Sequence, residues 1–217
     1  MKAAYTGWTW ITNREPEAAK NQLKQAFQEC KFLGYDTVEN FAFIRDYYAD
    51  DPQALVDLTK ECGVDLVNLY GHFTFDVEEA IRIAKEQIDF CAAVGVKWYN
   101  CQNAGFGDDG PSERPTNPEM LDKMCYVANT VGAYAKEKGV TLCFHPHYGT
   151  CVFWQSDIDY FAEHTNPDYV SFCFDTAHTT LAGMDPAALI RQYGSRVAYM
   201  HLKDVDTYAL SKAEGRD

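Results

Sequence analysis

Several features that mark other protein classes are missing from this chain of 217 residues. No apolar run approaches the ~20 residues that a membrane-spanning helix needs. The N-terminal stretch M-K-A-A-Y-T-G-W shows no signal peptide and leads directly into a strand pattern. Basic residues are scarce, because 19 Lys and Arg stand against 32 Asp and Glu, a formal net charge of −13. We therefore expect neither a membrane nor a nucleic acid as partner, since both are bound through basic surfaces.

The eight cysteines form no C-x-x-C pair, which argues against a structural zinc site. Inside apolar stretches a free thiol behaves as a small hydrophobic side chain. Four of the cysteines lie in such stretches: Cys91, Cys101, Cys143 and Cys173. This usage is typical of a reduced protein, and we expect a cytoplasmic location.

Apolar runs of strand length alternate with amphipathic runs of helix length along the whole chain. Strands are predicted at 3–8, 37–39, 64–70 and 96–101, and at the start of 141–150, 171–178 and 197–204. Helices are predicted at 15–32, 77–93, 118–138, 157–164 and 185–192, with another that Asp51 caps. This alternation predicts a parallel sheet with helical crossovers. No G-x-G-x-x-G loop follows the first strand, and polar residues follow nearly every strand. Both features favour a (β/α)8 TIM barrel over a doubly wound sheet.

The predicted barrel has one strand fewer than the closed form. Only thirteen residues follow Asp204, whereas a complete barrel usually takes ~250 residues. We therefore predict that residues 1–217 form a single domain, a TIM barrel apparently truncated after strand seven and lacking an eighth strand. Strands one and seven should flank a gap, with residues 205–217 either covering it or packing poorly. We expect a longer native chain to supply the missing strand.

Three stretches near the end of the chain have the same design. They are T-L-C-F-H-P-H-Y-G-T (141–150), S-F-C-F-D-T-A-H (171–178) and V-A-Y-M-H-L-K-D (197–204). Each begins as an apolar strand and then changes abruptly to His, Asp or Lys. The carboxyl ends of parallel strands meet at one end of a barrel, so we expect one convergent site. Asp175, His201 and His145 are the predicted ligands of a divalent metal.

The same stretches supply candidates for proton transfer and charge stabilisation. His145, His147 and His178 are candidate acids or bases, as is Glu39 at the end of the second predicted strand, and Lys203 could hold a developing oxyanion. A single His at a strand end is more often structural, but four of the six histidines fall in these stretches. Glu39 could equally be a solvated loop residue. We expect replacement of Asp175 by Ala to leave the fold intact, because the residue is predicted to follow its strand rather than pack inside it. Three tryptophans could wall the pocket: Trp8, Trp10 and Trp154.

In this order and spacing, F-H-P-H-Y-G-T, F-D-T-A-H and H-L-K-D resemble the xylose-isomerase-like TIM barrels, the sugar isomerase/epimerase superfamily. Within it they are most similar to the inosose dehydratase group. The resemblance implies a metal held by an acidic residue from strand five, Asp from strand six, His from strand seven and Glu from strand eight. Asp175 and His201 match two of these positions. His145 stands where many isomerases have Glu, and the strand-eight Glu has no counterpart.

The resemblance implies a metal-dependent lyase that dehydrates a 2-keto-inositol through an enediolate. Mixed nitrogen and oxygen ligands favour Mn²⁺ or Co²⁺, with Zn²⁺ as a further option. The implied partner is a small sugar or cyclitol, and a homo-oligomer is compatible with the sequence. A sugar isomerase or epimerase acting on a ketose is the first alternative. Phosphodiester cleavage at damaged DNA is a second, and the charge of −13 opposes it. A non-catalytic fragment or subunit with an incomplete metal site is the third.

Overall fold

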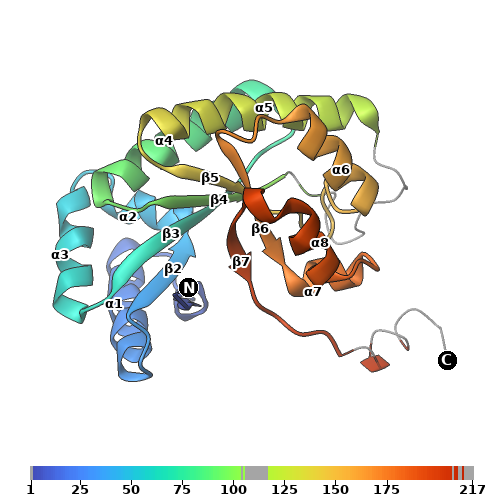
Figure 1. Cartoon of the computed structure of the whole chain (residues 1–217). Helices are drawn as coiled ribbons and strands as arrows, with labels where there is room; N and C mark the ends of the chain where they lie inside the picture. Colours follow the sequence, from blue (N-terminus) through green and yellow to red (C-terminus); the bar gives the residue numbers. More distant parts are fainter. Residues whose placement is uncertain (1, 104, 106–116, 207, 210–211, 213–217) are drawn as a thin grey trace.

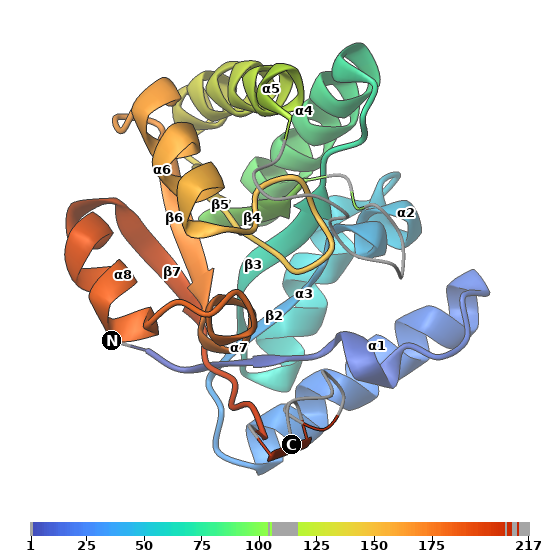
Figure 2. The same cartoon turned by 90° about the vertical axis from the view of Figure 1, so that its right-hand side faces the viewer.

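The computed structural model describes residues 2–103, 105, 117–206, 208–209 and 212. Within these residues, seven strands form one parallel sheet in sequence order, from β1 to β7. The sheet curls into an open barrel, and helices cover its outer side (Figures 1 and 2). The strands are β1 Ala4–Thr6, β2 Thr37–Phe41, β3 Asp65–His72, β4 Trp98–Gln102, β5 Thr141–Phe144, β6 Val170–Asp175 and β7 Val197–His201.

Helices connect the strands on the outside of the sheet. The α-helices are α1 Pro16–Phe32, α2 Arg45–Tyr48, α3 Pro52–Cys62, α4 Val77–Val94, α5 Pro118–Glu137, α6 Gln155–His164, α7 Thr176–Leu181 and α8 Pro186–Tyr193. Short 3-10 helices lie at Trp8–Trp10, Ala42–Ile44 and Gly194–Arg196. Among the described residues, no helix is both long and apolar enough to cross a membrane.

Local sequence signals account for the helix ends. Asp51 caps α3 by accepting a hydrogen bond from the backbone N–H of Ala54. Gly63 ends that helix in the left-handed conformation, at φ 68°, which favours glycine. Asp185 caps α8 in the same way as Asp51 caps α3, through the N–H of Ala187. These signals lie in the sequence itself, and the helices they bound were predicted within a few residues.

The two faces of the sheet differ in chemistry. Alternate strand residues such as Val38, Leu69, Leu142 and Phe172 point outward and join the apolar core beneath the helices. The intervening residues face the barrel interior and are mostly polar or small, although they are just as buried: Glu39, Asn68, Asn100, Cys143 and Cys173. TIM barrels usually fill this space with branched apolar side chains. The polar interior therefore continues the site at the strand ends down into the barrel.

The barrel is open between its first and last strands. In the described part of the chain, β1 pairs only with β2 and β7 only with β6. The predicted TIM-barrel arrangement of seven parallel strands is thus the architecture of the described residues. The expectation for residues 205–217 falls largely outside the described residues, although Asp206 and Tyr208 are described and exposed.

Two local predictions near the strand ends were wrong. The first strand ends at Thr6 rather than at Trp8, because Trp8–Trp10 turns into a 3-10 helix. Asp175 is not a residue beyond β6: it is the last residue of the strand and fully buried. It also caps α7, a six-residue helix that the sequence reading missed. Replacing Asp175 by Ala is therefore expected to cost stability.

Candidate metal centre and active site

Three of the predicted site residues lie side by side at the carboxyl ends of β5, β6 and β7. Asp175 and His201 end β6 and β7 and are direct neighbours in the strand register. His145 follows the last residue of β5, and its backbone N–H donates to the carbonyl of Cys101 on β4. Parallel pairing therefore delivers these side chains to one end of the barrel.

The two carboxylate oxygens of Asp175 have different roles: Oδ1 caps a helix and Oδ2 faces the site. Oδ1 accepts hydrogen bonds from the backbone N–H groups of Ala177 at 2.8 Å and His178 at 3.1 Å, which caps α7. Oδ2 makes no such bond to the backbone and faces a group of basic side chains. These are Lys203 Nζ at 2.7 Å, His145 Nε2 at 3.8 Å, His201 Nδ1 at 3.8 Å and His178 Nε2 at 3.9 Å.

The environment of Asp175 keeps it ionised. Burial alone raises the pKa of this carboxyl group. The neighbouring His145 and Lys203 and the hydrogen bond from the backbone N–H of His178 outweigh burial and hold the pKa well below its usual range. A buried carboxylate is costly unless it is paired, and here the half-exposed ammonium of Lys203 provides the ion pair.

His145 is the most deeply buried imidazole of the group, at 1% exposure. Its Nε2 lies 3.0 Å from Nδ1 of His201, and its Nδ1 has no hydrogen-bond partner. Burial lowers the pKa of His145 to about 4, although the nearby carboxylate of Asp175 acts in the opposite direction. The ring is therefore neutral at pH 7 and has lone-pair character, as a metal ligand or base requires.

His147 and His178 lie beside this group, with ring centroids 3.7 Å apart. Nδ1 of His147 lies 2.7 Å from the carbonyl oxygen of Tyr148. Since a carbonyl only accepts, Nδ1 carries the proton and Nε2 is left as the basic nitrogen. Burial lowers the pKa of His147, and burial together with the neighbouring His147 lowers that of His178 to about 3. Both ring nitrogens of His178 are buried without a hydrogen bond.

Glu39, on the far side of His201, is a buried hub and not a solvated loop residue. Its Oε1 accepts from the Thr6 hydroxyl at 2.5 Å, and its Oε2 lies 3.3 Å from Nε2 of His201. Oε2 also accepts from Asn68 at 3.2 Å and from the Tyr199 hydroxyl at 2.9 Å. Burial raises the pKa of Glu39, but the hydrogen bonds from His201, Thr6 and Tyr199 prevail and lower it to about 2. A carboxylate so fully engaged is a weak base.

The residues present fit a divalent metal ion. Nitrogens of His145 and His178 lie within 4 Å of the buried carboxylate oxygen Oδ2 of Asp175, and the ligand atoms of the three residues lie within 4.8 Å of one another. Nδ1 of His201 faces the same carboxylate, because Nε2 is held toward Glu39. Imidazole with carboxylate is a donor set that suits Mn²⁺, Co²⁺ and Zn²⁺.

The sequence reading missed Tyr70, a site neighbour on β3. Its ring lies 5.4 Å from that of His145 and 5.9 Å from that of His201. The signal was available, because Asn68 and Tyr70 alternate with apolar residues in V-D-L-V-N-L-Y and so share the inner face. Of the tryptophans, Trp8 packs on Phe41, which in turn contacts Tyr70. Trp10 instead donates a hydrogen bond to Glu29 on α1.

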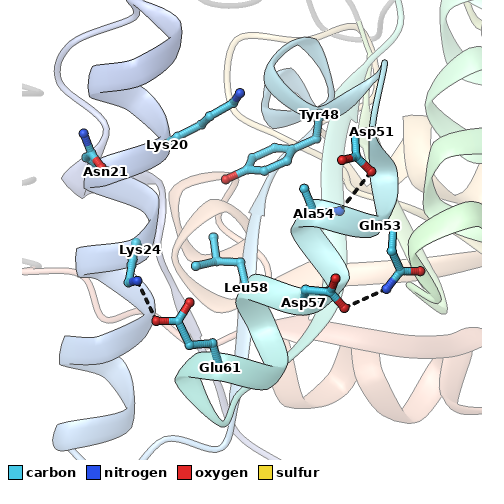
Figure 3. Close-up of a pocket in the computed structure, with 10 residues that line it drawn as sticks. All are labelled: Lys20, Asn21, Lys24, Tyr48, Asp51, Gln53, Ala54, Asp57, Leu58 and Glu61. Carbon is cyan, nitrogen blue, oxygen red and sulfur yellow. Dashed lines mark hydrogen bonds and ion pairs between the residues drawn. The ribbon is translucent and has the colours of Figure 1, made fainter.

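A surface depression of about 490 Å³ lies elsewhere, between α1 and α3 (Figure 3). Lys24 and Glu61 form an ion pair across it at 2.6 Å, and Asp57 binds Gln53 on its rim. The Lys24–Glu61 pair is partly exposed to solvent, and none of the histidines lines the depression. The strand-end cluster therefore remains the candidate site.

Comparison with known proteins shows what the chain is similar to in sequence and in fold. The model of the family described as xylose isomerase-like TIM barrel matches residues 27–216. An inosose dehydratase of Clostridium perfringens (strain 13 / Type A) is 28% identical over 207 residues, covering 90% of this chain and 68% of that protein. The crystal structure of the IolI protein with a bound zinc atom has a TM-score of 0.74 at 19% identity, over 94% of this chain and 73% of that one. An L-ribulose 3-epimerase structure has a TM-score of 0.76 at 16% identity, over 99% of this chain and 78% of that one.

Proposed function

Since the chain belongs to the family of xylose isomerase-like TIM barrels, which makes it a sugar-processing enzyme, we propose that it is a metal-dependent lyase. Its proposed reaction is the dehydration of a 2-keto-inositol. The relatives named inosose dehydratase support this substrate class. The H-P-H sequence at 145–147 supports it as well, because the resemblance implies Glu at this position in many isomerases of the superfamily.

One observation carries the proposal: Oδ2 of Asp175 lies within 4 Å of nitrogens from three imidazoles. We assign Asp175, His201 and His145 as the residues that would hold the ion. Mn²⁺ or Co²⁺ is the first choice and Zn²⁺ the second, because the donors are mixed nitrogen and oxygen. When bound, the ion supplies Lewis-acid stabilisation of negative charge on the substrate's carbonyl oxygen.

His147 is our assignment for the base that removes the proton α to the ketone. Its Nδ1–H is held by the Tyr148 carbonyl, which leaves Nε2 free to accept a proton. Its neighbour His178 is also neutral at pH 7, so neither is a ready proton donor. Lys203 is the ammonium group that faces Asp175, and we assign it to hold the enediolate oxygen or protonate the departing β-hydroxyl.

Glu39 is assigned as a positioning residue and not as a base. Its Oε2 accepts the Nε2–H of His201, which fixes the tautomer in which Nδ1 presents a lone pair toward Asp175. Such a carboxylate behind a ligating histidine orients the ring and raises its basicity. The same carboxylate holds Thr6 of β1 and Tyr199 of β7.

The test is turnover of a 2-keto-inositol, followed by the ultraviolet absorbance of the conjugated enone product. We expect activity with added Mn²⁺ or Co²⁺, loss of activity after chelation and its return on reloading. His147→Gln should lower kcat by about 10²–10⁴-fold, as loss of a general base does. His164→Gln is the matched control, because His164 also donates Nδ1–H to a carbonyl, that of Tyr160, but lies on α6 outside the site.

A sugar isomerase or epimerase is the second candidate, and the fold shared with L-ribulose 3-epimerase favours it. It would use the same base and the same enediolate but return the proton without losing water. Formation of an epimeric ketose without enone absorbance would select this alternative. A folded, metal-loaded chain that converts neither a 2-keto-inositol nor a ketose would refute both candidate functions.

A further inference from the structure

Cys173 lies directly below the Asp175 centre. The two residues are two positions apart on β6, so their side chains point to the same face of the sheet, the barrel interior. Phe172, just before Cys173, and Phe174, between Cys173 and Asp175, belong to the outer apolar core. The thiol of Cys173 is fully buried and free of any disulfide. It is therefore placed as a side chain of the site and not as packing beneath the helices.

The thiol forms a compact cluster with two of the site's imidazoles. His145, Cys173 and His201 each offer a ligand atom, and these atoms lie within 4.8 Å of one another. Within it, Nε2 of His145 and Nδ1 of His201 lie 3.0 Å apart. His145 also belongs to the cluster with Asp175 and His178. The molecule thus holds two overlapping ligand sets that share an imidazole, one with a carboxylate and one with a thiol.

The two sets differ in the ions they prefer. Carboxylate oxygen suits harder ions such as Mn²⁺, whereas thiolate selects softer ions such as Zn²⁺. Thiolate is the ligating form, so an ion that binds Cys173 forms a metal–sulfur bond and releases one proton from the thiol to solvent. An ion held this way draws on the two imidazoles that also face Asp175, so it competes with an ion held by the carboxylate.

We propose that His145, Cys173 and His201 form a thiolate site for a thiophilic divalent ion, which competes with the ion at Asp175. Zn²⁺ is the ion of this class that the donors suit best. Its occupation would remove His145 and His201 from the carboxylate centre and so inhibit any chemistry there. The site does not depend on the reaction proposed above, because it requires only the three side chains.

Cd²⁺ is the spectroscopic probe, because its bond to sulfur gives a charge-transfer band in the ultraviolet. The full chain, stripped of metal and kept reduced, is titrated with Cd²⁺. Cys173→Ser should remove the band and weaken Cd²⁺ binding by at least about tenfold, since a soft ligand is replaced by a hydroxyl. The matched control is Cys143→Ser, a buried inner-face cysteine on the neighbouring strand that lies outside the cluster. It should keep both the band and the affinity. Mn²⁺ affinity should be unchanged in both variants.

Two outcomes would overturn the proposal: a band of undiminished intensity in Cys173→Ser, or an equal loss in Cys143→Ser. Circular dichroism establishes that each variant is folded. If Cys173→Ser does not fold, ¹¹³Cd NMR of the unmodified chain decides instead, because a sulfur ligand shifts the resonance far from the nitrogen and oxygen range. A chain that binds Cd²⁺ through sulfur but takes no Mn²⁺ would contradict the proposed function and leave this site standing. A chain that takes Mn²⁺ but does not bind Cd²⁺ through sulfur would refute the thiolate site and leave the proposed function standing.

Discussion

Replacement of Asp175 separates the two roles of its oxygens. In Asp175→Asn the amide oxygen can still accept from the N–H groups of Ala177 and His178, and Asn caps helices about as well as Asp. The ion pair with the half-exposed Lys203 is lost, at a cost of about 0–1 kcal/mol. We therefore expect the free energy of unfolding of Asp175→Asn to lie within about 1 kcal/mol of that of the parent.

Asp175→Ala removes the cap as well. Loss of an N-cap costs about 1 kcal/mol, and a buried N–H left without a partner costs about 1–3 kcal/mol. On that basis we expect the free energy of unfolding of Asp175→Ala to be lower than that of the parent by roughly 2–3 kcal/mol. Asp185→Ala is the control: Asp185 caps α8 by one exposed hydrogen bond at 2.8 Å, so its loss should cost about 1 kcal/mol or less.

Urea unfolding in the presence of a chelator measures these stabilities, and calorimetric titration measures Mn²⁺ binding. Both Asp175 variants should bind Mn²⁺ at least about tenfold more weakly than the parent, whereas Asp185→Ala should bind it normally. Equal stability of Asp175→Asn and Asp175→Ala would show that Oδ1 is not the cap. Undiminished Mn²⁺ affinity in Asp175→Asn would refute the assignment of Oδ2 as a ligand.

Three further predictions follow from the charges around the site. The pKa of Glu39 is lowered from 4.5 to about 2, so its ionised form stabilises the fold by about 3 kcal/mol above pH 4.5, and that contribution disappears as the pH falls toward 2. Glu39→Gln should lack this pH-dependent part in acid unfolding, and an unchanged profile would contradict the hydrogen-bonded hub. His145 has a pKa of about 4 in the folded chain instead of 6.5, so as the pH falls from 6.5 to 4 the unfolded chain takes up this proton first and the free energy of unfolding falls. In chelator-treated protein, His145→Gln should flatten this dependence of the free energy of unfolding on pH, and an unchanged dependence would contradict the lowered pKa. Lys203→Gln removes an ammonium 2.7 Å from Oδ2 of Asp175, which should strengthen Mn²⁺ binding by about fivefold, or about 1 kcal/mol; weaker binding would mean that Lys203 does not compete with the ion.

The sequence predicted the strand ends of the site well, because each apolar run stops at a polar cluster. Parallel pairing then places Asp175 beside His201 without further information. The second function of Asp175 was not predictable in the same way. The stretch T-A-H-T-T-L is short and lacks an apolar period, so α7 forms chiefly because a strand-end carboxylate is there to cap it.

The environment of Glu39 was beyond local patterns for a different reason. A strand of three predicted residues that ends on a carboxylate reads equally well as a loop. What distinguishes the two is the approach of Tyr199 and His201, which lie 160 and 162 residues further along the chain. Tyr70 is the opposite case: it was missed, although its alternation with Asn68 would have placed it on the inner face.

The hydrogen bonds of Glu39 also bear on the order in which parts of the structure can form during folding. Strand pairs and crossover helices such as β3–α4–β4 involve contacts between nearby residues and can form early. The contact of Glu39 with Tyr199 joins the second strand to the seventh, so it closes a loop of 160 residues. His201 acquires its fixed ring orientation only when that loop has closed. Metal affinity should therefore appear last in refolding, after helical circular dichroism has recovered, which makes ion binding a reporter of completed topology.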